Sequence, residues 1–436
     1  MQRIAVSRRP VSPTLGRLFA FLVATIPAAA YAQGLTPEER RIANFVDDLR
    51  EEPIEFLERV VNIDSATQNL GGVRRVGEVF RAEFHRLGFE MSWEEMPPEM
   101  HRAGHLVAER KGTVGKRLLL IGHLDTVLEG GRFMRQGRRA TGSGALDMKG
   151  GDVILLYALK VLDRVGALEK RRIIVILTGD EEDAGLPIDQ SRRALFEAAR
   201  RSDLALAFES AIEDTGTVAR RGASTWKLCV SAKTGHSSRI FSDELGSGAI
   251  FEAARILDAF RRGVPEKYLT INPSVLVGGT TARYDGVAKS GTAEGKLNVI
   301  PARVIVEGDL RFISEDQKQG AREAMRKIVG HSLPRTEATI TFADKYPAMA
   351  PTEGNYQLLA ALDRASRDLD LGGVRALDPG RRGAGDISFV APTIDGLDGL
   401  GAKGEGEHAP DEWVDLGSLT PQIKRASLLI YRLTHP

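Results

Sequence analysis

From Thr36 onward, amphipathic helical patterns alternate with short apolar runs. Apolar residues recur at helical spacing in segments 44–61, 75–87, 153–165 and 191–201. Four runs have instead the length and apolarity of buried strands, namely 106–108, 118–121, 173–177 and 204–208. This alternation predicts an α/β sheet covered by helices on both faces. Ligands of such sheets bind at the carboxyl ends of the strands, so the residues after each run are the first candidates for chemistry.

The pattern changes in the middle of the chain. It predicts a strand, a helix, two strands, a helix and a strand, at 225–232, 248–262, 269–277, 297–312, 315–329 and 338–343. This β-α-β-β-α-β order is the split-βαβ arrangement. We therefore expect a second, smaller α+β unit between two parts of the larger one.

The first 32 residues have the composition of a secretory signal peptide. Four arginines among the first 17 residues precede an apolar run at 18–30, and Ala-Tyr-Ala at 30–32 forms a cleavage site. A membrane anchor is the alternative, but the run is short for the roughly 30 Å of a bilayer core, and Pro27 interrupts it. We expect cleavage, a periplasmic or secreted protein, and no membrane segment afterwards. The Arg8-Arg9 pair leaves both the general secretory and the twin-arginine route open.

Charge and cysteine content exclude several classes of function. The 60 Lys and Arg residues against 59 Asp and Glu residues give a net charge of +1, so no overall field attracts nucleic acid or acidic lipid. Cys229 is the only cysteine, which excludes an intramolecular disulfide framework and a cysteine-rich zinc module. We expect a globular protein that binds no nucleic acid.

Two of the apolar runs end in candidate metal-binding residues. Run 118–121 is followed by Gly-His-Leu-Asp-Thr, in which His123 and Asp125 point to the same side at the strand period of two. Such an imidazole is either a metal ligand oriented by the carboxylate or a hydrogen-bonded structural histidine. Run 173–177 is followed by four acids at 180–183, which need either a neighbouring cation or a solvated loop.

Three further polar residues stand in comparable places. Glu209 follows the last apolar run, Asp147 lies in a glycine-rich loop before a helix, and His408 lies in a loop of glycines and acids. Taken alone, each residue has an ordinary structural explanation; Asp147, for example, could be the N-cap of the helix that follows it. Jointly they provide two imidazoles and three carboxylates where strand ends converge: His123, Asp147, Glu182, Glu209 and His408. Without cysteine, this set suits a pair of divalent ions such as Zn²⁺, with one carboxylate bridging ions about 3.5–4 Å apart.

Four motifs follow one another along the chain, at 122–127, 144–151, 178–182 and 208–209. In this order they resemble the motifs of the peptidase family that contains bacterial glutamate carboxypeptidase, succinyl-diaminopimelate desuccinylase and the aminoacylases. The resemblance covers nearly the whole mature chain. It implies an α/β fold, with a mixed-sheet di-zinc exopeptidase domain interrupted by an α+β lid that forms dimers. The implied divisions are a signal peptide at 1–32, a catalytic domain at 33–221 and 348–436, and a lid at 222–347.

The resemblance also implies roles for the site residues. Asp147 looks like the bridging carboxylate, with His123 and Glu209 on one ion and Glu182 and His408 on the other. Glu181 resembles the general base, and Asp125 the acid behind His123. The implied cofactor is two Zn²⁺ ions, with Co²⁺ or Mn²⁺ as alternatives. Neighbouring Asp180 and Asp183 receive no role and are expected to be structural or solvated, and five histidines outside the motifs, including His105, receive no function.

Substrate-binding residues are implied in the lid and in one late loop. His236 resembles the lid histidine that helps to polarise the scissile carbonyl, often across a dimer, and Asn298 and Arg311 resemble groups that contact the substrate. An arginine suits a bidentate grip on a carboxylate, although Arg311 on a surface strand in a salt bridge is the alternative. Gly383 and Gly385 resemble a glycine-rich substrate loop, from which Ala384 departs.

We therefore expect a metal-dependent hydrolase that cleaves an amide bond next to a free carboxylate, as a carboxypeptidase or N-acyl-amino-acid hydrolase. The partner is a small molecule or peptide with a free carboxylate, and a homodimer through the lid is implied. A dipeptidase or aminopeptidase acting on free amines is one alternative, and hydrolysis of a non-peptide amide or carbamate is another. A non-catalytic binding protein would lack the base or a ligand, and both are present here.

Overall fold

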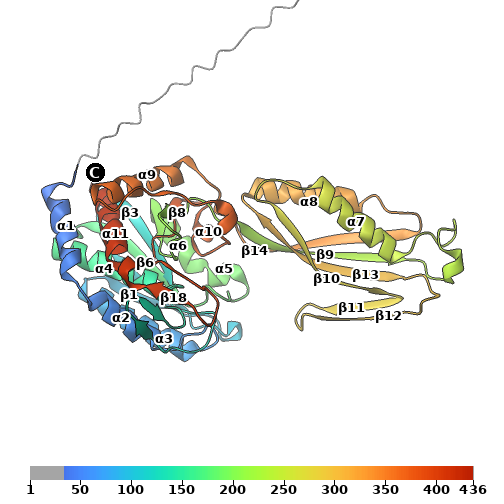
Figure 1. Ribbon diagram of the computed structural model, residues 1–436, viewed down its shortest axis with the longest axis horizontal. Coiled ribbons are helices and arrows are strands. Elements are labelled where there is room, and N and C mark those ends of the chain that lie inside the picture. Colours follow the sequence, from blue (N-terminus) through green and yellow to red (C-terminus); the bar gives the residue numbers. More distant parts are fainter. Residues whose placement is uncertain (1–33, 436) are drawn as a thin grey trace, which may run out of the picture. The chain divides into compact units, whose positions relative to one another are not determined.

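A mixed sheet of six strands organises the larger part of the chain (Figure 1). The computed structural model describes residues 34–435, so the predicted signal peptide at 1–32 lies outside the described residues. The strand order is β1 (Glu90–Glu94), β2 (His105–Arg110), β6 (Arg171–Thr178), β3 (Val114–His123), β7 (Leu204–Ala207) and β16 (Asp395–Leu397). Strands β6, β3, β7 and β16 are mutually parallel, whereas β2 is antiparallel to both of its neighbours. The carboxyl ends of β3, β6 and β7 therefore meet at one edge, as the sequence predicts.

Helices cover both faces of this sheet, because its central strands are apolar on both sides. In β3, Leu118 and Leu120 belong to one buried cluster, and Leu119 and Ile121 belong to another. The first cluster includes side chains of α1 (Pro37–Asp48), α2 (Glu52–Val61), α3 (Leu70–Arg86), α4 (Lys149–Arg164), α9 (Glu353–Asp368) and α11 (Leu419–Thr434). The second includes α6 (Arg193–Arg200) and α10 (Ile387–Val390). The predicted α/β fold with two covered faces is confirmed.

The helices differ from the predicted segments mainly at their ends. The predicted helical segment 44–61 is two helices, because Arg50 adopts a left-handed conformation with φ of 50° between α1 and α2. Predicted segment 191–201 corresponds to α6, and the short helix α5 (Ile188–Ser191) precedes it. The first helix begins with a reciprocal capping box, in which Thr36 and Glu39 each bind the other's backbone N–H.

Residues 222–346, which we call the inserted unit, form a separate antiparallel sheet. The elements along the chain are β9 (Gly222–Ala232), α7 (Ala249–Gly263), β10 (Thr270–Gly279), β13 (Arg303–Phe312), α8 (Glu315–Val329) and β14 (Thr336–Tyr346). The sheet order is β10-β13-β9-β14. Alternate residues such as Trp226, Leu228 and Val230 form its own buried cluster with α7 and α8. The predicted β-α-β-β-α-β order is thus present.

One hairpin in this unit was not predicted. Strands β11 (Thr281–Asp285) and β12 (Ser290–Glu294) pair with each other between β10 and β13, on the side of the sheet away from α7 and α8 (Figure 1). All five residues of β12 are exposed, so no alternation of apolar residues marks it in the sequence. The strand predicted for 297–312 begins only at Arg303, because Ile300 instead donates its N–H to the Gly235 carbonyl.

Short elements carry the remaining loops of the site. A small sheet has the order β17 (Gly404–Glu405), β18 (Trp413–Asp415), β5 (Arg139–Thr141) and β4 (Met134–Gln136), and a second pairs β8 (Thr215–Gly216) with β15 (Arg375–Ala376). Short 3-10 helices lie at Pro98–Met100, Ser237–Arg239, Pro379–Arg381 and Leu416–Ser418. No helix in residues 34–435 has the length and apolarity needed to cross a bilayer.

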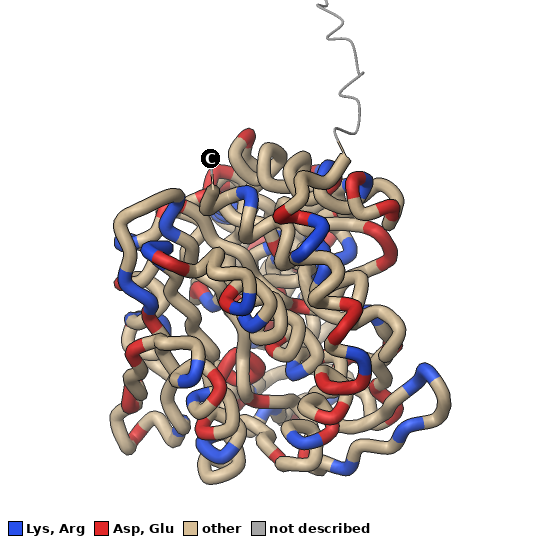
Figure 2. Tube along the Cα trace, turned by 90° about the vertical axis from the view of Figure 1, so that its left-hand side faces the viewer, with Lys and Arg blue, Asp and Glu red and all other residues tan. Residues whose placement is uncertain are grey.

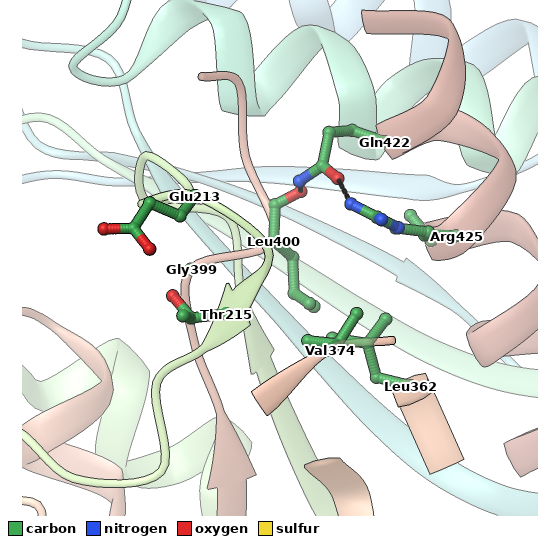
Figure 3. A pocket seen from close by; sticks show the side chains of 9 residues that line it. Glu213, Thr215, Leu362, Val374, Gly399, Leu400, Gln422 and Arg425 are labelled. Atoms are coloured by element: carbon green, nitrogen blue, oxygen red, sulfur yellow. Dashed lines mark hydrogen bonds between the residues drawn. The ribbon is translucent and has the colours of Figure 1, made fainter. Parts of the chain in front are cut away.

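Helix α11 holds the segment after β16 in place. In Figure 3, Gln422 lies between Arg425 and the backbone of Leu400 beside a small pocket. The Gln422 side-chain amide donates to the Gly401 carbonyl at 2.8 Å and accepts from Arg425 at 2.8 Å. Gly401 in turn donates its N–H to the carbonyl of Glu209 at 2.9 Å. A buried helix thereby fixes the backbone next to one of the predicted metal ligands.

Candidate metal centre and active site

The structure brings the five predicted metal ligands together at the carboxyl edge of the sheet. His123 is the last residue of β3, Glu182 follows β6, and Glu209 follows β7. Asp147 comes from the loop before α4, and His408 comes from the loop between β17 and β18. Parallel strands that end together, with two loops reaching over their edge, thus collect residues from distant parts of the sequence.

Two triads share the carboxylate of Asp147. His123, Asp147 and Glu209 form one, and Asp147, Glu182 and His408 form the other, with ligand atoms within 4.8 Å of one another in each. The His123 Nε2 atom lies 3.2 Å from Asp147 Oδ1, and the His408 Nε2 atom lies 3.2 Å from Asp147 Oδ2. The two oxygens of one carboxylate therefore face two different histidines. This is the arrangement expected of a carboxylate that bridges two ions.

The charges of the cluster call for a cation. Burial raises the pKa of Glu209 to about 8 and that of Glu182 to about 7, and the carboxylate of Asp147 adds to both shifts. Hydrogen bonds to Asp147 and Glu182 raise the pKa of His408 to about 11. Several carboxylates buried this closely cannot all be ionised without a compensating charge. The donor set, of imidazole nitrogens and carboxylate oxygens with no sulfur, fits zinc or a similar divalent ion.

The loop that carries Asp147 is fixed by Glu412, which the sequence analysis did not single out. The buried Glu412 carboxylate accepts backbone N–H groups from Gly144 at 3.1 Å, Leu146 at 2.7 Å and Asp147 at 3.0 Å. Its position, four residues after His408, means that one loop supplies both a metal ligand and the support of the shared carboxylate. Three bonds from one charged group hold the Asp147 backbone rigidly.

Asp125 does more than orient the neighbouring histidine. The His123 Nδ1 atom bonds the Asp125 backbone carbonyl at 3.0 Å, while the Asp125 carboxylate lies 3.6 Å from it. That carboxylate instead accepts the backbone N–H groups of Glu181 and Glu182, at 3.0 and 3.2 Å, and the hydroxyl of Thr67 at 2.7 Å. Asp125 therefore orients His123 through its main chain and positions the Glu181–Glu182 turn through its side chain.

Glu181 lies beside the cluster without belonging to either triad around Asp147. A third group of ligand atoms joins it with His123 and Glu182, again within 4.8 Å. Burial and the nearby Glu209 carboxylate raise the pKa of Glu181 well above its ordinary value. Its backbone carbonyl accepts the hydroxyl of Tyr346 at 3.0 Å. A carboxylate next to the ion site, and held from its main chain, has the placement of a proton acceptor.

Glu209 is connected to the glycine-rich loop by the buried Arg220. The Arg220 guanidinium lies 3.7 Å from Glu209, and it pairs with Asp398 at 2.6 Å. It also donates to the backbone carbonyls of Gly383 at 2.7 Å and Ala384 at 3.0 Å. A Cβ atom on Gly385 would lie 2.4 Å from this guanidinium, so the loop needs glycine there to approach it.

The predicted lid residues form a second group. His236 Nδ1 accepts the backbone N–H of Ser238 at 3.3 Å and lies 2.8 Å from the Ser238 hydroxyl, so Nε2 is the ring nitrogen left for a substrate. The Asn298 carbonyl accepts the N–H of Ser237 at 2.9 Å, so His236 and Asn298 lie on adjoining segments. None of the metal-ligand groups in residues 34–435 includes His236.

Arg311 has a partner on its own strand and lies next to the glycine-rich loop. Its Nε atom donates to Asp309 at 2.8 Å, which is the salt bridge considered as the alternative. Its Nη1 atom lies 4.0 Å from where a Cβ of Gly383 would stand. The Nε bond leaves the terminal nitrogens of the guanidinium for another carboxylate.

The acids on either side of the Glu181–Glu182 pair differ from each other. Asp180 is fully buried and pairs with Arg192 at 2.5 Å, whereas Asp183 is exposed and pairs with Arg102 at 2.6 Å. Asp180 is therefore structural and Asp183 is solvated, which are the two roles expected for these acids. His105, which received no function, is buried in the same region and accepts the N–H of Gly179 at 3.1 Å.

Comparison with known proteins agrees with this geometry. A model of the peptidase family M20/M25/M40 matches residues 119–432. The chain belongs to this family. The M20 chain is therefore a hydrolase of the metallopeptidase type, as the resemblance of its motifs implies.

Individual relatives of the M20 chain match most of its length. Carboxypeptidase G2 from a Pseudomonas species is 26% identical over 429 residues, covering 94% of this chain and 97% of that protein. Succinyl-diaminopimelate desuccinylase from Delftia acidovorans is 24% identical over 399 residues, covering 87% and 96%. The crystal structure of a Staphylococcus aureus tripeptidase matches with a TM-score of 0.70 at 18% identity, covering 91% of this chain and 99% of that chain. This structural match shows the M20 fold.

Four residues of this M20 site were missed from the sequence. Glu412 lies in a loop that the analysis did single out, and its acidic side chain among glycines was a usable indication. Arg192, Arg220 and Tyr346 have no local pattern, because each contacts a partner far away in the chain. Only the fold shows which acids these residues meet.

Proposed function

We propose that this protein is a two-zinc hydrolase that cleaves an amide bond next to a free carboxylate, as a carboxypeptidase or N-acyl-amino-acid hydrolase. The observation that carries the proposal is the Asp147 carboxylate shared by two histidine-containing triads, with Glu181 beside them. A pair of ions can then be held a short distance apart, next to a carboxylate that belongs to neither triad around Asp147.

The chain's own residues divide into ion-binding and proton-transfer groups. Asp147 would bridge the ions, His123 and Glu209 would complete one set, and Glu182 and His408 the other. Bound zinc supplies a water of lowered pKa and Lewis-acid polarisation of the scissile carbonyl.

Glu181 then acts as general base and general acid. It accepts the proton of the attacking water and passes it to the leaving amine. The Asp125 carboxylate, which holds the N–H groups of both Glu181 and Glu182, keeps the base in register with the ligand next to it. This coupling of base and ligand through one buried acid favours proton transfer in a fixed geometry.

Recognition of the substrate carboxylate is proposed for Arg311 and the glycine-rich loop. The Arg311 guanidinium next to Gly383 offers a planar pair of donors, which suits a carboxylate. His236, through Nε2, and Asn298 would act at the scissile carbonyl and the substrate backbone. The similarity to carboxypeptidase G2, over 94% of this chain, supports a substrate that is recognised by its free carboxylate rather than by a free amine.

We further propose a homodimer that forms through the inserted unit. Three apolar side chains near the start of α7 are exposed: Phe241 (65%), Ile250 (46%) and Phe251 (52%). The rings of Phe241 and Phe251 lie 5.4 Å apart, so they form one apolar surface that a second copy can cover.

The evenly mixed charges of Figure 2 support a partner other than nucleic acid.

The proposed location is outside the cytoplasm. Its support is the basic segment, apolar run and cleavage site in residues 1–32. Fractionation of cells that express the full chain tests it, since the mature protein should appear in the periplasm or medium and begin after residue 32.

The proposed activity is tested with a panel of substrates on the mature protein. N-acetyl, N-benzoyl and long-chain N-acyl amino acids are compared with free-amine dipeptides, each with added Zn²⁺ or with EDTA. We expect hydrolysis of the N-blocked substrates that EDTA abolishes. Hydrolysis of the free-amine dipeptides alone would replace the carboxypeptidase or acylase assignment with a dipeptidase one.

A further inference from the structure

Arg192 is a fully buried cation between the loop of the proposed base and the glycine-rich loop. Its Nη1 atom lies 2.5 Å from Asp180 Oδ1, and its Nη2 atom donates to the Asp180 carbonyl at 3.0 Å. Its Nε atom lies 2.8 Å from Asp386 Oδ1, which is an ion pair without the alignment of a hydrogen bond. Asp180 directly precedes Glu181, and Asp386 directly follows Gly385. One guanidinium therefore connects the two loops that the proposed reaction needs.

Further hydrogen bonds hold both Asp180 and Asp386 in place. Asp180 also accepts the hydroxyl of Ser191 at 2.7 Å and the N–H of Gly185 at 2.9 Å, which closes the turn from 180 to 185. Asp386 accepts the hydroxyl of Thr178, the last residue of β6, at 2.5 Å. The network thus extends from the end of a central strand, through both acids, to the base turn.

Aromatic packing holds the same region from a second side. The Arg192 guanidinium carbon lies 5.3 Å from the centre of the Phe389 ring, and the Tyr346 ring lies 5.2 Å from that of Phe389. Tyr346 then donates its hydroxyl to the Glu181 carbonyl. The main chain of Glu181 is therefore held between the Asp180–Arg192 pair and the Tyr346 hydroxyl.

A buried ion network of this kind is poorly explained by stability alone. Removing charges from water is costly, and well-packed apolar residues of similar volume often stabilise a protein as much or more. What an arginine adds is a wide planar cation, which bonds Asp180 through its terminal nitrogens and pairs with Asp386 through Nε at the same time. A lysine has one ammonium nitrogen on a flexible stem, so it lacks the separate nitrogens that contact the two acids from fixed positions.

We propose that Arg192 is a positioning residue that holds the Glu181 turn and the 383–386 loop in one alignment. The base and the substrate carboxylate are then at a fixed separation when the amide bond is attacked. The inference rests on the proposed function, since it assumes that Glu181 is the base and that this loop contacts the substrate.

The test combines kinetics with local hydrogen exchange on the full-length mature protein. Arg192→Lys keeps the charge and removes the planar guanidinium, while Asp180→Asn and Asp386→Asn each weaken one side. Arg102→Lys is the matched control, since Arg102 holds Asp183 at the other end of the same turn, where the carboxylate is exposed. Metal content and thermal unfolding are measured for every variant.

We expect Arg192→Lys to keep its metal and to lose about 10–100-fold in kcat/KM, which is the cost of a small misalignment. Asp180→Asn should mainly lower kcat, and Asp386→Asn should mainly raise KM. Exchange should accelerate in Arg192→Lys for peptides that cover both 178–186 and 380–390, and in Arg102→Lys for neither beyond about twofold.

Two results would overturn the inference. One is wild-type kinetics and exchange in Arg192→Lys. The other is acceleration of exchange across the whole protein with equal kinetic effects of both aspartate variants, which indicates a role in stability only. The exchange measurement needs no turnover, so it still tests the connection of the two loops if the wild-type protein hydrolyses none of the panel.

Discussion

The support of Asp147 by Glu412 leads to a quantitative prediction about metal affinity. Glu412→Gln leaves a side chain that accepts two N–H groups through its oxygen and presents its own NH₂ to the third. One charge-assisted bond, of those to Gly144, Leu146 and Asp147, is then lost, and the others become neutral. Hydrogen bonds to charged groups contribute about 1.5–3 kcal/mol each and neutral ones about 1 kcal/mol.

The expected loss is therefore at least about 1.5 kcal/mol in the stability of the loop that presents Asp147. Because that loop must be ordered to bind the ions, most of this loss should appear as weaker metal binding. We expect about a 10–100-fold lower affinity, the range found for outer groups that hold metal ligands. Glu412→Ala, which removes all three bonds, should lie at the upper end or beyond.

Competition with a chromogenic chelator measures the affinity, and kcat/KM at saturating Zn²⁺ measures the residual alignment. Glu405→Gln is the matched control, because Glu405 is an exposed acid at the end of β17, directly before the same loop. If Glu412→Ala binds metal as tightly as the wild type, Glu412 does not support the ligand loop and the reasoning from its three bonds is refuted.

Three further predictions concern the substrate loop, the carboxylate grip and the dimer. Gly385→Ala should lower kcat/KM by at least about 10-fold in a steady-state assay with metal content unchanged, because its Cβ would stand 2.4 Å from Arg220; wild-type kinetics would contradict this. Arg311→Lys should raise KM for N-acyl amino acids about 10-fold and leave the amide analogues unaffected, since a lysine gives no bidentate grip; equal effects on both substrates would argue against carboxylate recognition. Phe251→Asp should convert the dimer to a monomer in sedimentation velocity, with exposed Tyr356→Asp on α9 as control; an unchanged dimer would exclude this surface.

Much of the site could be predicted because strand ends concentrate chemistry in a parallel sheet. His123, Glu182 and Glu209 each follow an apolar run that is long enough to be recognised as a buried strand. Asp147 and His408 were found through glycine-rich loops, whose composition indicates close backbone approach. The convergence of these residues needed only the expectation that parallel strands end together.

The rest depends on contacts that no local pattern records. Arg192 is one of several arginines in a polar segment, and nothing in the sequence separates it from exposed Arg193. Its burial follows from the packing of α5 and α6 against the sheet and from the arrival of Asp386 from almost 200 residues away in the chain. The hairpin at 281–294 was missed for a related reason, since its exposed strands carry no apolar alternation.

The central claim is that Glu181 transfers protons beside a pair of ions that it does not hold. Glu181→Gln, compared with the wild type by metal analysis and by hydrolysis of the best N-acyl substrate, tests this most directly. We predict two ions per chain in both proteins and a fall in kcat of at least about 10²–10⁴-fold in the variant. Loss of an ion in Glu181→Gln, or hydrolysis at the wild-type rate, would contradict the account.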